Sequence, residues 1–426
     1  MADLAAIVGA DGVRPAGGAD GIDGLSPAFV VEPGSVEDGA AAVRAASEAG
    51  LALCPVGGGS KIGWGGPPER LDVVLSTVRL DRVLEHAAGD LVVRAQAGVR
   101  LDDLQRELAS AGQTLALDPA EPDATLGGIV AAGASGPRRL RFGTPRDLLI
   151  GVTVVLADGS VTKAGGKVVK NVAGYDLGKL YAGSFGTLGL ICEVIFRLHP
   201  LPAARRLVTA EVGTPEAAWA SASRLSATPL VPSAVELSWP DRGGPGRMAA
   251  LFEGIEAGVE SQAARAAEAL GRVPGTGAPD VSDGTAWDGT WAARWPERGD
   301  DGPGDAWLGV KLTHPPASLG EALRATWDAG SRGGLRVAVR SHAAVGVCHA
   351  AFAGGGDDAC ALALGTLRAA AAARGGSAVA LKAEPGLKRR LDVWGPAGDV
   401  LPLMRRVKER FDPGRTFSPG RFLGGI

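Results

Sequence analysis

The sequence predicts an α+β protein with two domains, and three observations point to this class. The chain has 426 residues, which is long for one domain, and 46% of them are hydrophobic, enough to bury a sizeable core. Strand-like and helix-like patterns both occur along the chain. The segment Pro200-Leu201-Pro202 marks a domain boundary, because two prolines in three residues interrupt both helix and sheet.

The first expected elements surround a run of three glycines. Ser35 can cap a helix that ends at Gly50, and Asp38 stands three residues after the cap. Residues 51–56 then indicate a buried strand, and residues 57–61 follow it with the sequence Gly-Gly-Gly-Ser-Lys. Successive N–H groups at the end of a strand can form an anion-binding nest. A flexible turn is the alternative, because this run is neither a Rossmann G-x-G-x-x-G nor a Walker A motif.

Further strands and helices are expected on both sides of the prolines. Hydrophobic residues alternate in the expected strands and recur every three or four residues in the expected helices. Asp158-Gly159 is a turn sequence typical of a hairpin. The pattern predicts a strand over 91–99, a helix from Leu101 toward Gly112, a hairpin of 152–156 with 161–163, a strand over 208–212 and a helix over 217–225.

Glycine-containing motifs recur between residues 119 and 196. They are Thr125-Leu126-Gly127-Gly128, Gly143-Thr144-Pro145-Arg146-Asp147 and Gly183-Ser184-Phe185-Gly186-Thr187-Leu188-Gly189. Glycine is required where a side chain would keep backbone amides away from a ligand. Together with residues 55–60, these motifs resemble those of flavoproteins of the vanillyl-alcohol oxidase and p-cresol methylhydroxylase type, from about Ser26 to Pro200 and again at the C-terminus.

This resemblance implies a two-subdomain p-cresol methylhydroxylase-type FAD-binding domain, followed by an α+β cap domain of the FAD-linked oxidase C-terminal type. The expected division is a lead-in over 1–25, the FAD-binding domain over 26–203 and the cap domain over 204–426, with an irregular insert at about 274–305. FAD is expected to bind non-covalently, since the usual histidine beside the diphosphate loop is absent. The residues expected to bind FAD are Pro55, Val56, Gly57, Gly58, Gly59, Ser60, Lys61, Pro119, Thr125, Leu126, Gly127, Gly128, Ser135, Gly136, Phe142, Gly143, Gly189 and Ile191.

Three further segments resemble a narrower group, the second FAD-type subunit of bacterial glycolate oxidase: residues 134–139, 165–177 and 411–422. The resemblance implies a complex that oxidises glycolate or another small 2-hydroxy acid. Its expected partners are a second FAD-binding glycolate oxidase subunit and an iron–sulfur subunit that takes the electrons onward. Two alternatives stay open: a free-standing FAD-dependent 2-hydroxy-acid dehydrogenase, and a non-catalytic assembly subunit that keeps the fold.

Two histidines bear on a metal site. In related 2-hydroxy-acid dehydrogenases, a histidine pair and a later Glu-His hold a metal. His342 and His349 have the spacing of that pair, but Val345 and Val347 replace the intervening Asp and Asn, and Glu384-Pro385-Gly386 stands where Glu-His-Gly would fall. No metal is therefore expected, and no catalytic residue is assigned.

Lys170, Tyr175 and Asp176 follow a glycine pair and precede an apolar helix. They are candidates for catalytic groups, but a structural role is the preferred interpretation. In that role Asp176 caps a helix over 177–182 and Tyr175 packs within the flavin domain.

The charge balance argues against a nucleic-acid partner. The chain has 44 Lys and Arg against 47 Asp and Glu, a formal net charge of −3. Arg138, Arg139 and Arg141 cluster locally. Such a cluster is either a solvated or salt-bridged surface, or a contact for a flavin phosphate or an anionic substrate.

Cysteine spacing and hydropathy bear on the cellular compartment. Cys54, Cys192, Cys348 and Cys360 show no C-x-x-C spacing, so reduced, buried thiols are expected rather than an iron–sulfur or zinc site. No apolar run reaches about 18 residues, and the N-terminal residues lack a basic region. The expectation is a cytoplasmic protein without a membrane span, with peripheral association at the inner face of the cell membrane left open.

Overall fold

The computed structural model describes the whole chain except residues 1, 168–174, 288–290, 292–294 and 296–306. Spatial contacts divide the chain into two compact units. The domain limits expected from the sequence, 26–203 and 204–426, remain a prediction, and the contacts group the last segment of the chain with the first unit. The first unit comprises 1–135, 143–201 and 396–426, and the second comprises 136–142 and 202–395.

The first sheet of the first unit has the strand order β1-β2-β4-β3. Strands β3 and β4 pair in parallel, and their side chains Leu53, Cys54 and Val73 are buried. Helix α2 begins where the sequence predicts, because the Ser35 hydroxyl accepts a hydrogen bond from the Asp38 N–H at 3.0 Å. The bounds are α1 Ala2–Val8, β1 Val13–Pro15, β2 Phe29–Val31, α2 Val36–Glu48, β3 Leu53–Val56 and β4 Val73–Ser76.

The second sheet of this unit is antiparallel, with the order β5-β6-β10-β8-β9. Strands β8 and β9 form the predicted hairpin, in which Val155 pairs with Val161. In α3 the predicted periodic leucines Leu101, Leu104 and Leu108 are buried. The bounds are β5 Val83–Ala87, β6 Val92–Gln96, α3 Leu101–Ala109, β7 Gln113–Thr114, α4 Leu126–Ala132, α6 Pro145–Leu148, β8 Leu149–Val155, β9 Val161–Gly165, α7 Gly178–Tyr181, β10 Leu190–Arg197, β11 His199–Pro200 and α13 Leu401–Phe411.

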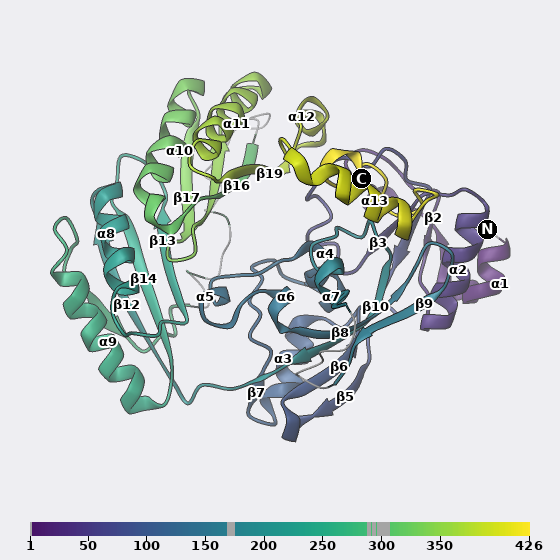
Figure 1. Ribbon diagram of the computed structural model, residues 1–426, viewed down its shortest axis with the longest axis horizontal. Helices are drawn as coiled ribbons and strands as arrows, with labels where there is room; N and C mark the ends of the chain where they lie inside the picture. Colours follow the sequence, from purple (N-terminus) through teal and green to yellow (C-terminus); the bar gives the residue numbers. More distant parts are fainter. Residues whose placement is uncertain (1, 168–174, 288–290, 292–294, 296–306) are drawn as a thin grey trace. The chain divides into compact units, whose positions relative to one another are not determined.

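The second unit is built on an antiparallel sheet of order β15-β12-β14-β13-β17-β18-β16-β19. Alternate residues of its strands, such as Val208, Val310 and Ala350, form one apolar core with residues of α8, α9, α10 and α11. These helices cover one face of the sheet (Figure 1). The bounds are α5 Arg139–Phe142, β12 Ala204–Val212, α8 Pro215–Ser226, β13 Ala234–Trp239, β14 Gly246–Gly254, α9 Glu256–Gly271, β15 Asp280–Ser282, β16 Trp307–Thr313, α10 Leu319–Gly333, β17 Arg336–His342, β18 Val347–Ala353, α11 Asp357–Ala372, β19 Ser377–Ala383 and α12 Pro385–Arg390.

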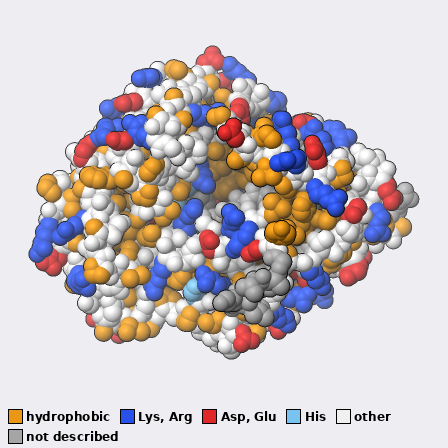
Figure 2. Space-filling view, in the orientation of Figure 1, with side chains coloured by type: hydrophobic (Ala, Val, Ile, Leu, Met, Phe, Trp, Pro, Cys, Tyr) orange, Lys and Arg blue, Asp and Glu red, His pale blue; other side chains and the backbone are white. Residues whose placement is uncertain are grey.

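The elements and side chains confirm several expectations from the sequence. The α+β class is confirmed, as are the strand and the helix predicted directly after the prolines, which lie within β12 and α8. All four cysteines are free and buried, as predicted. Figure 2 shows basic and acidic side chains interspersed over the visible face, in keeping with the near balance of charge in the sequence.

Candidate functional site

The glycine run after β3 packs directly against a second segment of the first unit. A Cβ on Gly57 would lie 2.0 Å from Thr125 Oγ1, and a Cβ on Gly58 would lie 1.9 Å from the carbonyl oxygen of Asp123. Gly59 has a φ of +70°, a conformation that favours glycine. The three glycines therefore allow the loop to turn and to approach residues 123–125 closely.

The second segment opens helix α4. The Thr125 hydroxyl accepts a hydrogen bond from the Gly128 N–H at 3.4 Å and so caps the helix. The Gly127 N–H donates to the Ala97 carbonyl at 2.8 Å, and a Cβ on Gly127 would meet the Ala97 Cβ at 2.7 Å. Glycine at this position lets α4 start in contact with the end of β6.

The third segment, residues 183–189, lies beside α4. The N–H groups of Gly183 and Phe185 donate to the carbonyls of Val130 and Ala131, at 2.9 and 2.8 Å. Gly186 has a φ of +69° and approaches Pro55 of β3, where an added Cβ would lie 3.5 Å from the proline ring. Segments that are far apart in the sequence thus meet around one point.

A pocket opens where the three segments meet, and twelve residues predicted to bind FAD line it. Its wall is mainly backbone and small side chains, which suits close contact with a cofactor. The predicted residues in the lining are Pro55, Val56, Gly57, Gly58, Gly59, Ser60, Lys61, Thr125, Gly127, Gly128, Gly189 and Ile191.

Six predicted residues lie outside this lining: Pro119, Leu126, Ser135, Gly136, Phe142 and Gly143. Leu126 is the first residue of α4 and is fully buried. Gly143 has a φ of +85° and supports the turn before α6, where a Cβ would lie 2.7 Å from Asp147 Cβ. Gly136 and Phe142 group with the second unit. A role of these six residues in cofactor binding remains a prediction.

Nine lining residues were missed from the sequence: Cys54, Ile62, Thr77, Ala131, Ala132, Phe185, Gly186, Leu190 and Arg421. Phe185 and Gly186 belong to the same glycine motif, 183–189, as the predicted residue Gly189. Arg421 belongs to the C-terminal segment 411–422, which carries part of the resemblance. The others are apolar or hydroxyl residues of strands, helices and the turns that follow them, and no local signal distinguishes them.

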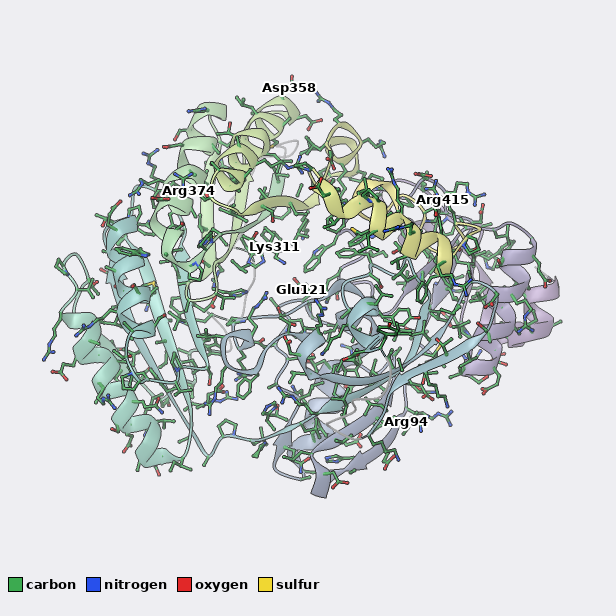
Figure 3. All side chains as sticks on the ribbon, viewed as in Figure 1. Arg94, Glu121, Lys311, Asp358, Arg374 and Arg415 are labelled. Atoms are coloured by element: carbon green, nitrogen blue, oxygen red, sulfur yellow. The ribbon has the colours of Figure 1, made fainter. Side chains whose placement is uncertain are left out.

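The C-terminal segment supports the strand that leads into the glycine run. The Leu53 N–H donates to the Thr416 carbonyl at 2.7 Å, and the Ser418 N–H donates to the Leu53 carbonyl at 2.7 Å. The ring of Phe422 stacks on Phe185 of the pocket, with centroids 5.5 Å apart. Arg415, labelled in Figure 3, belongs to the same segment and forms an ion pair with Glu69 at 2.8 Å.

A buried lysine fastens this segment. Lys408 Nζ donates to Asp412 Oδ2 at 2.6 Å and to the carbonyls of Thr187 and Phe417 at 2.7 and 2.8 Å. Asp412 is fully buried and also accepts from the N–H groups of Thr416 and Phe417. Burial lowers the pKa of Lys408, and the carboxylate of Asp412 opposes that effect. Residues 408–417 are therefore tied to the segment that contains Gly186.

The second unit carries a cluster of polar side chains on the sheet face opposite its helices. His342 Nδ1 lies 2.8 Å from Glu236 Oε1, and both side chains are buried. The rings of His342 and His349 meet edge to face, with centroids 5.4 Å apart. Arg340 and Lys311 are the cross-strand neighbours of His349 on β17 and β16, and Lys311 lies on the side of the sheet away from α10 (Figure 3).

The expectation that no metal binds at His342 and His349 stays a prediction. Nδ1 of His342 faces the Glu236 carboxylate. Within the part of the chain that the structure describes, no three His, Cys, Asp or Glu side chains are grouped as metal ligands.

The arginine cluster after residue 137 forms salt bridges within the second unit. Arg138 binds the Glu253 carboxylate through two hydrogen bonds of 2.8 and 3.1 Å. Arg141 donates to the Glu253 carbonyl at 2.7 Å. For Arg138 the salt-bridged interpretation fits better than contact with a flavin phosphate, whereas the contact of Arg141 is with a backbone carbonyl.

Two structural roles expected before α7 were wrong. Leu177, not Asp176, is the N-cap of α7, and no side chain caps that helix. Tyr175 is 93% exposed and does not pack within the unit. Lys170, the third candidate there, lies outside the described residues. Among the described helices, none has both the length and the apolar character needed to cross a bilayer.

Comparisons with known proteins match the part of the chain that contains most of the pocket lining. Residues 27–165 match a family described as FAD binding domain. The chain is 33% identical over 211 residues to glycolate oxidase subunit GlcD of Bacillus subtilis (strain 168), a match that covers 49% of this chain and 45% of that protein. It is 38% identical over 137 residues to glycolate oxidase subunit GlcE of Escherichia coli (strain K12), covering 32% and 39%. The chain thus spans less than half the length of either relative.

The fold of the chain is also similar to that of a solved flavoprotein structure. The solved structure of p-cresol methylhydroxylase with substrate bound is similar with a TM-score of 0.75 and 16% identity, over 99% of this chain and 95% of that chain. The pocket of the first unit lies largely within the matched residues and is lined by backbone amides and two cations, which suits a phosphate-bearing cofactor. The fold is the α+β fold of the p-cresol methylhydroxylase type, and FAD is the cofactor of this chain.

Proposed function

We propose that this chain is an FAD-dependent oxidoreductase subunit of a complex that oxidises glycolate or another small 2-hydroxy acid. The observation that carries the proposal is the pocket formed by residues 55–61, 125–128 and 183–191, in a chain similar to two different glycolate oxidase subunits. A second FAD-binding subunit and an iron–sulfur subunit are the proposed partners, and they take the electrons onward. The proposed location is the cytoplasm, with peripheral association at the cell membrane.

FAD, when bound, supplies a two-electron acceptor for the carbon that bears the substrate hydroxyl. Residues of the first unit hold that cofactor, and we place substrate selection in the expected cap domain, 204–426. There the Glu236 carboxylate lies beside His342 Nδ1 and fixes the orientation of the imidazole. His342 is the proposed proton acceptor of this face. Lys311 and Arg340 add positive charge near His349, which suits a carboxylate substrate.

Non-covalent attachment of FAD is part of the proposal. Ser60 and Lys61 follow the glycines where a histidine attachment point would stand, and Cys54 is buried with its sulfur 3.6 Å from Ser418 Oγ. Acid precipitation of the yellow protein is expected to release all of the flavin into the supernatant. Colour retained in the protein pellet would contradict this part.

The first test is an anaerobic visible spectrum of the purified chain, before and after addition of glycolate. A flavin band that bleaches supports a competent oxidising site in this chain. A yellow protein that does not bleach alone, but does so after the partner subunits are added, supports a relay role within the complex. A yellow protein that bleaches in neither state contradicts the proposed oxidation and leaves the cofactor assignment standing.

A further inference from the structure

Two cations line the FAD pocket, and they come from opposite ends of the sequence. They are Lys61, directly after the glycine run, and Arg421, near the C-terminus. Among the described residues of the lining, none is Asp or Glu. Lys61 is partly neutralised from outside the lining, because Glu121 lies 3.7 Å from its Nζ. The lining itself is therefore cationic.

Arg421 is held in place by the backbone that follows the glycine run. Its Nη2 donates to the carbonyls of Ile62 and Trp64, each at 2.7 Å, and the residue is only 2% exposed. The Gly66 N–H in turn donates to the Arg421 carbonyl at 2.9 Å. The two carbonyl contacts fix the guanidinium at the wall of the pocket.

FAD brings a suitable anion, because its diphosphate carries negative charge at neutral pH. Guanidinium groups bind phosphate oxygens with strong, charge-assisted hydrogen bonds, and a preorganised guanidinium loses little side-chain entropy on binding. We propose that Arg421 is a cofactor-binding residue whose guanidinium complements the charge of the FAD diphosphate. The C-terminal segment is then part of the cofactor site and not only a support for it.

A purely structural role for Arg421 makes a different prediction. If the residue only holds the loop after the glycine run, its loss should weaken the binding of every flavin by the same factor. If it complements the diphosphate, its loss should weaken the binding of FAD but not the binding of riboflavin, which has no phosphate. The two roles are therefore separated by the choice of flavin.

The experiment compares the apoproteins of the unmodified chain, Arg421→Met, Arg421→Lys and Arg415→Met. Arg415 is a matched control, because it lies in the same segment with its side chain 49% exposed and paired with Glu69, outside the pocket lining. Dissociation constants for FAD and riboflavin are measured by quenching of flavin fluorescence. Arg421→Met is expected to bind FAD about 10- to 100-fold more weakly, the usual effect of losing a charged hydrogen bond. The affinity of Arg421→Met for riboflavin should stay within about twofold of that of the unmodified chain. The affinity of Arg421→Lys for FAD should lie between those of Arg421→Met and the unmodified chain, and Arg415→Met should bind FAD as the unmodified chain does.

The proposal would be overturned if Arg421→Met lost affinity for both flavins equally, or lost no affinity for FAD. Should Arg421→Met fail to fold, titrations of the unmodified chain at rising salt concentration decide the matter. Binding of FAD that weakens with salt while riboflavin binding does not supports the charge role, since salt screens charged contacts. Binding of both flavins that is insensitive to salt contradicts it. Neither measurement depends on which hydroxy acid the protein oxidises.

Discussion

The cofactor pocket of the first unit and the polar face of the second are built in different ways. The pocket is lined mostly by backbone and small side chains of three glycine-containing segments, and each segment is contiguous in sequence. The polar face consists of side chains on separate strands, and its central pair, Glu236 and His342, is 106 residues apart. Local motifs thus identify a backbone-lined site, whereas a site made of side chains from separate strands becomes visible only after the sheet is assembled.

The largest expected effect tests the backbone-lined pocket. Gly58→Val should abolish flavin retention, because the new Cβ would lie 1.9 Å from the Asp123 carbonyl and force the loop away from α4. Gly63→Ala is the matched control, since a Cβ at Gly63 meets nothing within 4 Å. The measurement is the ratio of flavin to protein absorbance after gel filtration. A yellow Gly58→Val protein would show that close loop packing is dispensable.

A second variant asks whether the pocket also depends on a distant side-chain anchor. Lys408→Met leaves the buried Asp412 carboxylate without its cation, which typically costs about 3–5 kcal/mol. Urea denaturation should show that loss in the free energy of unfolding, together with weaker FAD retention. Arg406→Met, on the exposed side of the same helix, should change neither. An unaltered Lys408→Met midpoint would mean that the C-terminal segment contributes little to the first unit.

The third variant addresses the polar face of the second unit. Glu236→Gln removes the charge beside His342 Nδ1 while keeping the size of the side chain. Under the proposed function, glycolate-dependent flavin reduction should slow by about tenfold or more, as for loss of an acid–base partner. The FAD content should stay constant, and the pH dependence of the reduction rate should shift. Glu211→Gln, exposed on β12, serves as the control. Unchanged reduction would remove His342 from the proposed chemistry.

The smallest expected effect is a pH dependence of stability in the second unit. Burial lowers the pKa of His314 below its ordinary value of 6.5, because the imidazolium loses hydration. Above pH 6.5 His314 is neutral in both the folded and the unfolded chain, so the folded state loses no stability through this residue. As the pH falls below 6.5 the unfolded chain binds the proton first, and stability declines toward the lower, folded pKa. The loss is about 1.4 kcal/mol for each pH unit between the two pKa values. Melting temperatures at pH 7.5 and pH 5.5 should differ less in His314→Gln, and an equal difference would contradict this assignment.

Elements fixed by local chemistry could be predicted from the sequence. The cap of α2 by Ser35 and the β8–β9 hairpin depend on residues within a few positions of each other. The glycine run could be recognised locally, but its close contacts with Asp123 and Thr125 join distant parts of the chain and could not be predicted. The cap expected from Asp176 failed because the chain enters α7 through Leu177. Arg421 could not be placed in the pocket, since its position depends on contacts with Ile62 and Trp64, more than 350 residues away.

The distance in sequence between Leu53 and its partners Thr416 and Ser418 has a consequence for biosynthesis. A ribosome makes the chain from the N-terminus at about 5–20 residues per second. The glycine run is therefore translated tens of seconds before the residues that brace β3 and supply Arg421. During that interval the second unit can fold, because all of its residues precede Pro396. Stable capture of FAD should therefore wait until residues 416–421 have been made, so the supply of free flavin from that moment onward should govern the yield of holoprotein.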